Sequence, residues 1–151
     1  MLKKYSTTAS LKSLEKHVES IEEFLRRVDE EYGLRVAVVF GSHARGDATQ
    51  LSDVDMILVC RKLPDGWLER LKSVGQYAKF PIQALAYTVE ELEEAVRRPC
   101  FAILDAILEG VPLVDDGTWE KVKRVYSEIK EKYSLRKEGR KWRFNPKALP
   151  Y

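Results

Sequence analysis

The chain has 151 residues, of which 44% are apolar and 33% charged, and its formal net charge is +2. This length suits one folded domain, and the apolar content is enough to close a core, which excludes a wholly disordered chain. The small net charge hides an asymmetry, because residues 1–116 carry 15 basic and 20 acidic side chains whereas residues 117–151 carry 11 basic and 4 acidic ones. The sequence therefore combines an acidic body with a basic end.

Membrane, secreted and disulfide-rich classes do not fit this sequence. Its apolar runs are far shorter than the ~20 residues that cross a bilayer, and no apolar stretch follows Lys3 and Lys4 as it would in a secretory signal. Cys60 and Cys100 stand apart, without the spacing of a zinc site or a disulfide framework. We therefore expect a cytoplasmic protein with reduced thiols and no membrane partner.

The first part of the chain predicts one helix and two buried strands. Apolar residues recur three and four positions apart over residues 11–32, with Ser10 as a candidate N-cap and Gly33 as a candidate stop. The Val-rich run 34–40 predicts a strand that is buried on both faces. Residues 53–60 predict a second buried strand, with carboxylates at its start.

The rest of the chain predicts further helices alternating with strands. These are a helix over 67–78, a strand over 82–87, a helix that starts at a capping box of Thr88 and Glu91 and stops before Pro99, a helix over 100–109, a strand over 111–114 and an amphipathic helix over 118–132. The alternation predicts an α/β or α+β fold, in which a small mixed β-sheet is flanked by helices. Beyond Ser134 the chain shows no clear periodicity.

The polar stretch between the two buried strands has the residue types of a phosphate and metal site. Gly41 and Ser42 follow the first strand directly, and backbone N–H groups and a hydroxyl at such a turn suit phosphate oxygens. Arg45 adds a guanidinium that can pair with phosphate. Asp53 and Asp55 point to one side of a strand, where two carboxylates repel unless a hard cation such as Mg²⁺ lies between them. Each feature alone is common in ordinary turns, but together they are the components of metal-assisted nucleotidyl transfer.

The order strand, Gly41-Ser42, ten residues, Asp53-x-Asp55 and strand resembles the signature of the DNA polymerase beta-like nucleotidyltransferase superfamily. Residues 34–60 are similar to its minimal nucleotidyltransferase (MNT) branch. The resemblance implies a polymerase beta-like fold, Mg²⁺ or Mn²⁺ as cofactor, and transfer of a nucleoside monophosphate from an NTP, in the first place ATP, to a hydroxyl. It assigns Gly41 and Ser42 to triphosphate binding, and Asp53 and Asp55 to metal binding and catalysis. Proteins of this branch often act as antitoxins of HEPN-type toxins, so the resemblance also implies a HEPN-type partner.

The third carboxylate of the family has no acidic counterpart in this chain. On the predicted strand 82–87 the expected position is Gln83, whose amide carbonyl can ligate a cation but carries no charge. Two functions therefore stand side by side, an active nucleotidyltransferase and a catalytically weakened subunit that binds nucleotide and metal. Glu90 and Glu91 lie nearby, but their place in the first turn of a helix explains them.

His43 and Asp47 complete the polar residues of the motif. A phosphate or a base would be a suitable partner for His43, but we expect a partly exposed turn histidine. Asp47 either supports the turn or is solvated.

The basic end allows two interpretations. We divide the chain into a nucleotidyltransferase domain over residues 1–133 and a basic, aromatic tail over residues 134–151. Trp142, Phe144 and Tyr151 lie among six Lys and Arg residues, a pattern that suits an RNA-binding module, which is a third candidate function. The same aromatics suit packing onto the domain or onto a second copy in a homodimer, and packing is slightly favoured because Trp and Phe rarely remain in solvent.

Overall fold

The structure of the chain is a computed structural model that describes residues 9–98 and 100–145. Its main sheet has four strands in the order β3-β2-β1-β4. β1 (Leu34–Phe40) pairs antiparallel with both β2 (Val54–Cys60) and β4 (Val111–Asp115), whereas β2 runs parallel to β3 (Ile82–Tyr87). The predicted mixed sheet is thus confirmed, and its two central strands, β1 and β2, are the ones that flank the motif.

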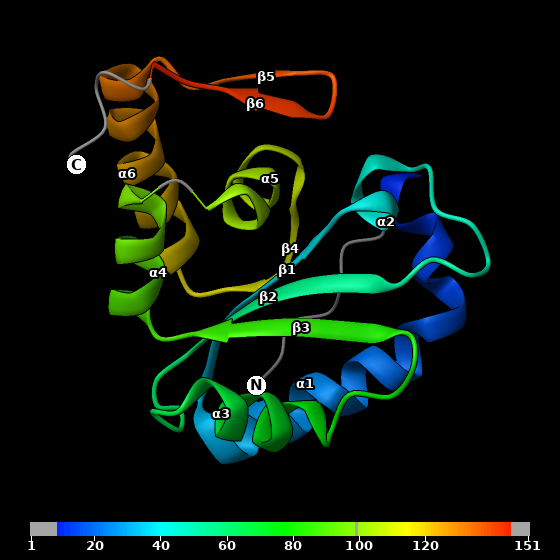
Figure 1. The fold of residues 1–151 in the computed structure, drawn as a ribbon. Coiled ribbons are helices and arrows are strands. Elements are labelled where there is room, and N and C mark those ends of the chain that lie inside the picture. Colours follow the sequence, from blue (N-terminus) through cyan, green and yellow to red (C-terminus); the bar gives the residue numbers. More distant parts are fainter. Residues whose placement is uncertain (1–8, 99, 146–151) are drawn as a thin grey trace.

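Helices cover both faces of this sheet. Within the described residues they are the 3-10 helix η1 (Ala9–His17), α1 (Val18–Tyr32), α2 (Ser42–Arg45), α3 (Trp67–Gly75), α4 (Val89–Arg97), α5 (Phe101–Glu109) and α6 (Thr118–Tyr133). Figure 1 shows α1 and α3 on one face and α4, α5 and α6 on the other. Among residues 9–98 and 100–145, no helix has the length and apolar character that a membrane span requires.

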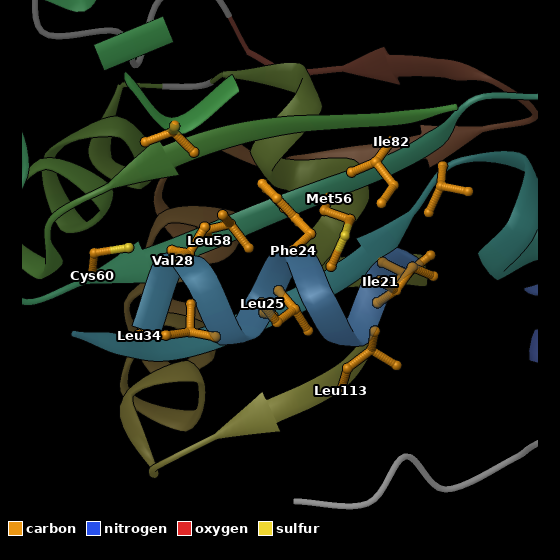
Figure 2. Close-up of a cluster of buried hydrophobic side chains, with 14 of the residues drawn as sticks. Ile21, Phe24, Leu25, Val28, Leu34, Met56, Leu58, Cys60, Ile82 and Leu113 are labelled. Carbon is orange, nitrogen blue, oxygen red and sulfur yellow. The ribbon is translucent and has the colours of Figure 1, made fainter. Parts of the chain in front are cut away.

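β1 and β2 are buried on both faces because successive side chains of a strand point in opposite directions. Figure 2 shows the layer between the sheet and α1, where Phe24 and Val28 lie against Met56, Leu58 and Cys60. Cys60 is a free thiol, and burial raises its pKa to about 12, as befits a reduced core cysteine. Two apolar layers therefore hold the central strands rigidly, and with them the turn that joins these strands.

Two helix boundaries differ from those that the sequence predicts. The segment predicted as one helix over 11–32 begins as η1 and becomes α-helical only at Val18, although Gly33 ends it as predicted, with φ 72° and its N–H donating to the Asp29 carbonyl. The helix predicted over 67–78 ends at Gly75, because glycine disfavours helix and the chain must turn there toward β3.

The predicted capping box at the start of α4 is confirmed. Thr88 Oγ1 accepts from the Glu91 N–H at 3.3 Å, and the Glu91 carboxylate accepts from the Thr88 N–H at 2.8 Å. The same carboxylate accepts from Arg70 Nη1 at 2.8 Å. Glu91 therefore caps the helix, as predicted, and it also forms an ion pair with Arg70 that the sequence does not predict.

The basic end contains a small hairpin that the sequence pattern does not predict. β5 (Arg136–Glu138) pairs antiparallel with β6 (Lys141–Arg143), and Gly139, with φ 61°, stands in the turn between them. The indole Nε1 of Trp142 donates to Asp105 Oδ1 on α5 at 2.7 Å. The structure thus supports the packing interpretation for Trp142, whereas Tyr151 lies outside the described residues.

Candidate functional site

The predicted site residues come together where β1 ends and β2 begins. The last residue of β1, Phe40, is the antiparallel register partner of Asp55. Gly41 and Ser42 continue directly from Phe40 into α2, and Asp53 immediately precedes β2. Strand pairing therefore places the glycine turn and the two carboxylates at one end of the β1–β2 pair (Figure 1).

Gly41 allows the backbone of this turn to approach a carboxylate closely. Its φ of 75° lies in the region that L side chains rarely adopt, and a Cβ added there would stand 2.8 Å from Asp55 Oδ2. Its carbonyl accepts from the Arg45 N–H at 3.0 Å, and the Ser42 carbonyl accepts from the Gly46 N–H at 3.0 Å, so the turn closes on itself. The turn suited to phosphate and the carboxylate suited to metal are thus direct neighbours.

The two carboxylates interact electrostatically. Burial raises the pKa of Asp55 above its usual value, and the negative charge of Asp53 raises it further, while His43 and Arg45 act in the opposite direction. Two acidic groups held this way in a half-buried position destabilise each other when both are ionised. A cation bound between them would relieve that repulsion.

This donor set fits a divalent cation that arrives with a nucleotide. Within the described residues no cluster of three or more His, Cys, Asp or Glu side chains is arranged to hold a metal. Mg²⁺ is commonly bound by one or two carboxylates together with substrate phosphates, which is what Asp53 and Asp55 can offer beside the Gly41 turn. Mn²⁺ accepts the same oxygen ligands.

Gln83 occupies the position expected for the missing third carboxylate. In the parallel pairing of β2 with β3, Asp55 is the register partner of Gln83, so the two side chains share a face of the sheet. Gln83 is exposed on the edge strand. The strand pairing therefore places an uncharged amide directly beside Asp55 in the sheet.

Arg45 contacts acidic side chains instead of standing free. Its Nε lies 3.4 Å from Asp47 Oδ2, and its Nη1 lies 3.4 Å from Glu109 Oε2. Asp47 also accepts from Arg140 Nη2 of the hairpin at 3.4 Å, and its side chain is about half exposed. Because these contacts are long, a phosphate that binds at the turn can replace them at small cost.

The prediction that His43 is a partly exposed turn residue is wrong, because His43 is only 2% exposed. Ser13 Oγ of η1 lies 2.7 Å from His43 Nδ1, and His43 Nε2 faces the Ser52 carbonyl at 3.5 Å. His43 thus links η1 and α2 to the loop that precedes Asp53. It is buried because η1 covers it, and the sequence does not predict the 3-10 turns of η1.

Two residues beside the site carry no signal in the sequence. Glu109 contacts Arg45 across 64 positions of the chain, and Lys137 contacts Glu109 across 28. Nothing in the local pattern around α5 or the hairpin indicates these pairs, because they depend on how α2 and the hairpin lie on α5. Only the tertiary structure connects them to the motif.

A groove runs along the edge strand β3 and ends at the site. It has a volume of about 540 Å³ and is lined by residues of α3 and β3, among them Leu71, Leu85 and Gln83, and by Phe40, Asp55 and Met56 of the two neighbouring strands. Leu71 and Leu85 are exposed in this groove. The groove therefore presents apolar side chains together with the Asp55 carboxylate.

Comparison with known proteins adds independent findings. Residues 21–137 match the family described as nucleotidyltransferase domain. Over 54 residues the chain is 38% identical to a candidate protein adenylyltransferase of Methanocaldococcus jannaschii, and the aligned stretch covers 34% of this chain and 37% of that relative. The chain thus matches little more than a third of that relative's length.

Solved structures resemble the fold at low sequence identity. A crystal structure of a candidate nucleotidyltransferase from Sulfolobus solfataricus has a TM-score of 0.50 at 18% identity, covering 71% of this chain and 87% of that one. A toxin–antitoxin structure with AMP-PNP has a TM-score of 0.47 at 15% identity, covering 75% of this chain and 83% of that one. The first of these supports the fold class.

Proposed function

Because the chain belongs to the nucleotidyltransferase domain family, we propose that it moves a nucleoside monophosphate from an NTP to a hydroxyl acceptor with the help of Mg²⁺ or Mn²⁺. The observation that carries this proposal is the position of Gly41. Because glycine has no Cβ, the backbone of the turn can lie directly beside Asp55 Oδ2. A phosphate bound at the turn would lie beside the carboxylates, and a cation there would join both. The family membership agrees with the resemblance that the motif shows.

Each residue of the motif has a role in this proposal. The backbone of Gly41 and the N–H and hydroxyl of Ser42 hold the triphosphate, and Arg45 adds a positive charge. Asp53 and Asp55 would hold the cation, which would supply positive charge beside the phosphates. The acceptor hydroxyl forms a bond to the α-phosphorus and releases its proton to solvent, while the bond from that phosphorus to the β-phosphate oxygen breaks and pyrophosphate leaves.

We propose ATP as the donor and a protein hydroxyl as the acceptor. The similarity to a candidate protein adenylyltransferase supports both choices. The groove along β3 supports the second, because an extended acceptor segment lying in it would reach Asp55. The resemblance of residues 34–60 to the MNT branch supports a more specific role, in which the acceptor belongs to a HEPN-type toxin and this chain is the antitoxin.

A transfer assay tests the proposal. The chain is incubated with α-labelled ATP, GTP, CTP or UTP and Mg²⁺ or Mn²⁺, alone and with a HEPN-type protein encoded beside it. We expect label to move from ATP to the partner in the wild type, and to be lost in Asp53→Asn and Asp55→Asn. Glu90→Gln removes an acidic charge from α4, outside the site, and should transfer normally. Tight NTP binding without transfer to any acceptor would exclude the enzyme.

A second candidate function is supported by Gln83. Because this amide stands opposite Asp55 in the register, the chain lacks an acid at the place where the family uses a third one. A weakened subunit would bind the metal–nucleotide complex and leave catalysis to another protein. The same assay separates the two functions, because the weakened subunit retains NTP binding and shows no transfer. By contrast, the RNA-binding function gains no support, since Trp142 is engaged with Asp105.

A further inference from the structure

A chain of ion pairs connects the C-terminal hairpin to the motif. Lys137 Nζ of β5 lies 2.8 Å from Asp105 Oδ1 and 2.6 Å from Glu109 Oε1. The other carboxylate oxygen of Glu109 lies 3.4 Å from Arg45 Nη1. The Glu109 carboxylate therefore stands between a cation of the hairpin and the cation of the motif, and Figure 1 shows the hairpin crossing over α5 in the direction of α2.

The two contacts of Glu109 differ in strength. The Lys137 side chain is only 8% exposed and its contacts are short, so this pair is strong and little screened by solvent. Burial lowers the pKa of Lys137, but the hydrogen bonds to Asp105 and Glu109 outweigh burial and leave this pKa raised, so the ammonium stays charged at neutral pH. Arg45 is held only at 3.4 Å. Lys137 is thus the main counter-charge of Glu109.

We propose that Lys137 is a positioning residue of the nucleotide site, because by neutralising Glu109 and Asp105 it leaves the Arg45 guanidinium available to the triphosphate. This inference rests on the proposed function. Without Lys137, Glu109 would compete with the phosphates for Arg45. Asp105 and Glu109 would also add uncompensated negative charge beside the place where the triphosphate binds. This charge would repel the triphosphate and raise the free energy of its bound state.

The test measures the Kd of the full-length chain for Mg–ATP by calorimetry. Lys137→Met should raise this Kd about tenfold, a size typical of coupling between two groups that do not touch directly. Adding Glu109→Gln to Lys137→Met removes the competing carboxylate and should restore most of the affinity. Trp142→Phe is the matched control, because it breaks the other bond between the hairpin and Asp105 without changing any charge. Its Kd should equal that of the wild type.

The outcomes separate this inference from the proposed function. If Lys137→Met binds Mg–ATP as tightly as the wild type, or if Trp142→Phe weakens binding equally, Lys137 has no role through Arg45 and only anchors the hairpin. If Lys137→Met does not fold, the single variant Glu109→Gln provides the test. It should bind Mg–ATP at least as tightly as the wild type, and weaker binding would overturn the inference. If the wild type binds no Mg–ATP, the proposed function fails, and the role of Lys137 fails with it.

Discussion

The β1–α2–β2 segment and the C-terminal hairpin meet at the same end of the molecule, but they are held there by different forces. In the first, backbone geometry places the site residues, since Phe40 pairs with Asp55 and Gly41 adopts a positive φ. In the second, side chains make the attachment, with Lys137 and Trp142 reaching residues of α5 that lie 28 and 37 positions away. The chemistry is thus encoded locally, and the charges around it are set by distant parts of the chain.

Gly41→Ala is the strongest way to test the backbone half of this comparison. The added Cβ would meet Asp55 Oδ2 at 2.8 Å, so either the turn or the carboxylate must move. Because displacing a reacting group by about 1 Å can cost on the order of a hundredfold in rate, we expect transfer to fall at least that far. Because φ 75° and ψ −151° lie in a region that is essentially restricted to glycine, the substitution should also destabilise the fold by about 1–3 kcal/mol. Initial rates of transfer and chemical denaturation measure the two effects.

Gly46→Ala is the matched control for this change. Gly46 also has a positive φ, of 86°, but a Cβ there meets nothing within 4 Å. Backbone strain should also destabilise this variant, but to a smaller degree, because Gly46 has φ 86° and ψ 11°, whereas Gly41 has φ 75° and ψ −151°, a conformation essentially restricted to glycine. Most of the transfer activity should remain. If both variants lose transfer equally, backbone strain alone explains the loss and the close approach to Asp55 is unimportant.

Asp55→Asn should separate activity from stability. Losing a metal ligand should reduce transfer about a hundredfold, which corresponds to about 2.7 kcal/mol of transition-state free energy. Because the folded state raises the pKa of Asp55, the ionised carboxylate is disfavoured in the fold. The free energy of unfolding of the wild type therefore falls as the pH rises through that raised pKa. Without metal, Asp55→Asn should therefore have a higher Tm than the wild type at pH 7.

Thermal unfolding as a function of pH and Mg²⁺ checks this prediction. The difference in Tm should vanish below the usual pKa of Asp, where the wild-type carboxyl is protonated in both states. Mg²⁺ with ATP should raise the Tm of the wild type and leave that of the variant nearly unchanged. A variant that is less stable than the wild type at pH 7 would show that Asp55 makes favourable contacts that its pKa does not reflect.

The sequence predicts the β1–α2–β2 segment well and the side-chain contacts of the C-terminal hairpin poorly. The Val-rich run of β1 and the Gly41-Ser42 turn are local patterns, so their positions follow from residues that are neighbours in the chain. His43 is the exception inside the motif, since its burial depends on η1 some thirty positions earlier. The role of Glu109 depends on the hairpin, and the short alternating segment around Gly139 is too brief and too highly charged to predict strands.

Gln83→Asp tests whether the missing third acid limits the rate. Because Gln83 is the register partner of Asp55, a carboxylate there would stand on the same face of the sheet and add a ligand or a base. We expect kcat to rise about tenfold, below the range usually attributed to a well-placed general base. Gln83→Asn shortens the side chain without adding charge and should not raise kcat. An unchanged kcat in Gln83→Asp would show that a different step or the acceptor limits transfer.

Trp142→Phe has the smallest expected effect and tests the side-chain half of the comparison. Phe keeps most of the apolar surface but cannot donate to Asp105, which still accepts from Lys137. The free energy of unfolding should therefore fall by about 1 kcal/mol, the usual contribution of one hydrogen bond, with transfer unchanged. Arg140→Met is its control, because Arg140 is 79% exposed and lies 3.4 Å from Asp47, and such surface pairs contribute almost nothing. If Trp142→Phe also lowered transfer, the position of the hairpin would affect the site independently of the charge of Lys137. The β1–α2–β2 segment and the hairpin would then form one functional unit.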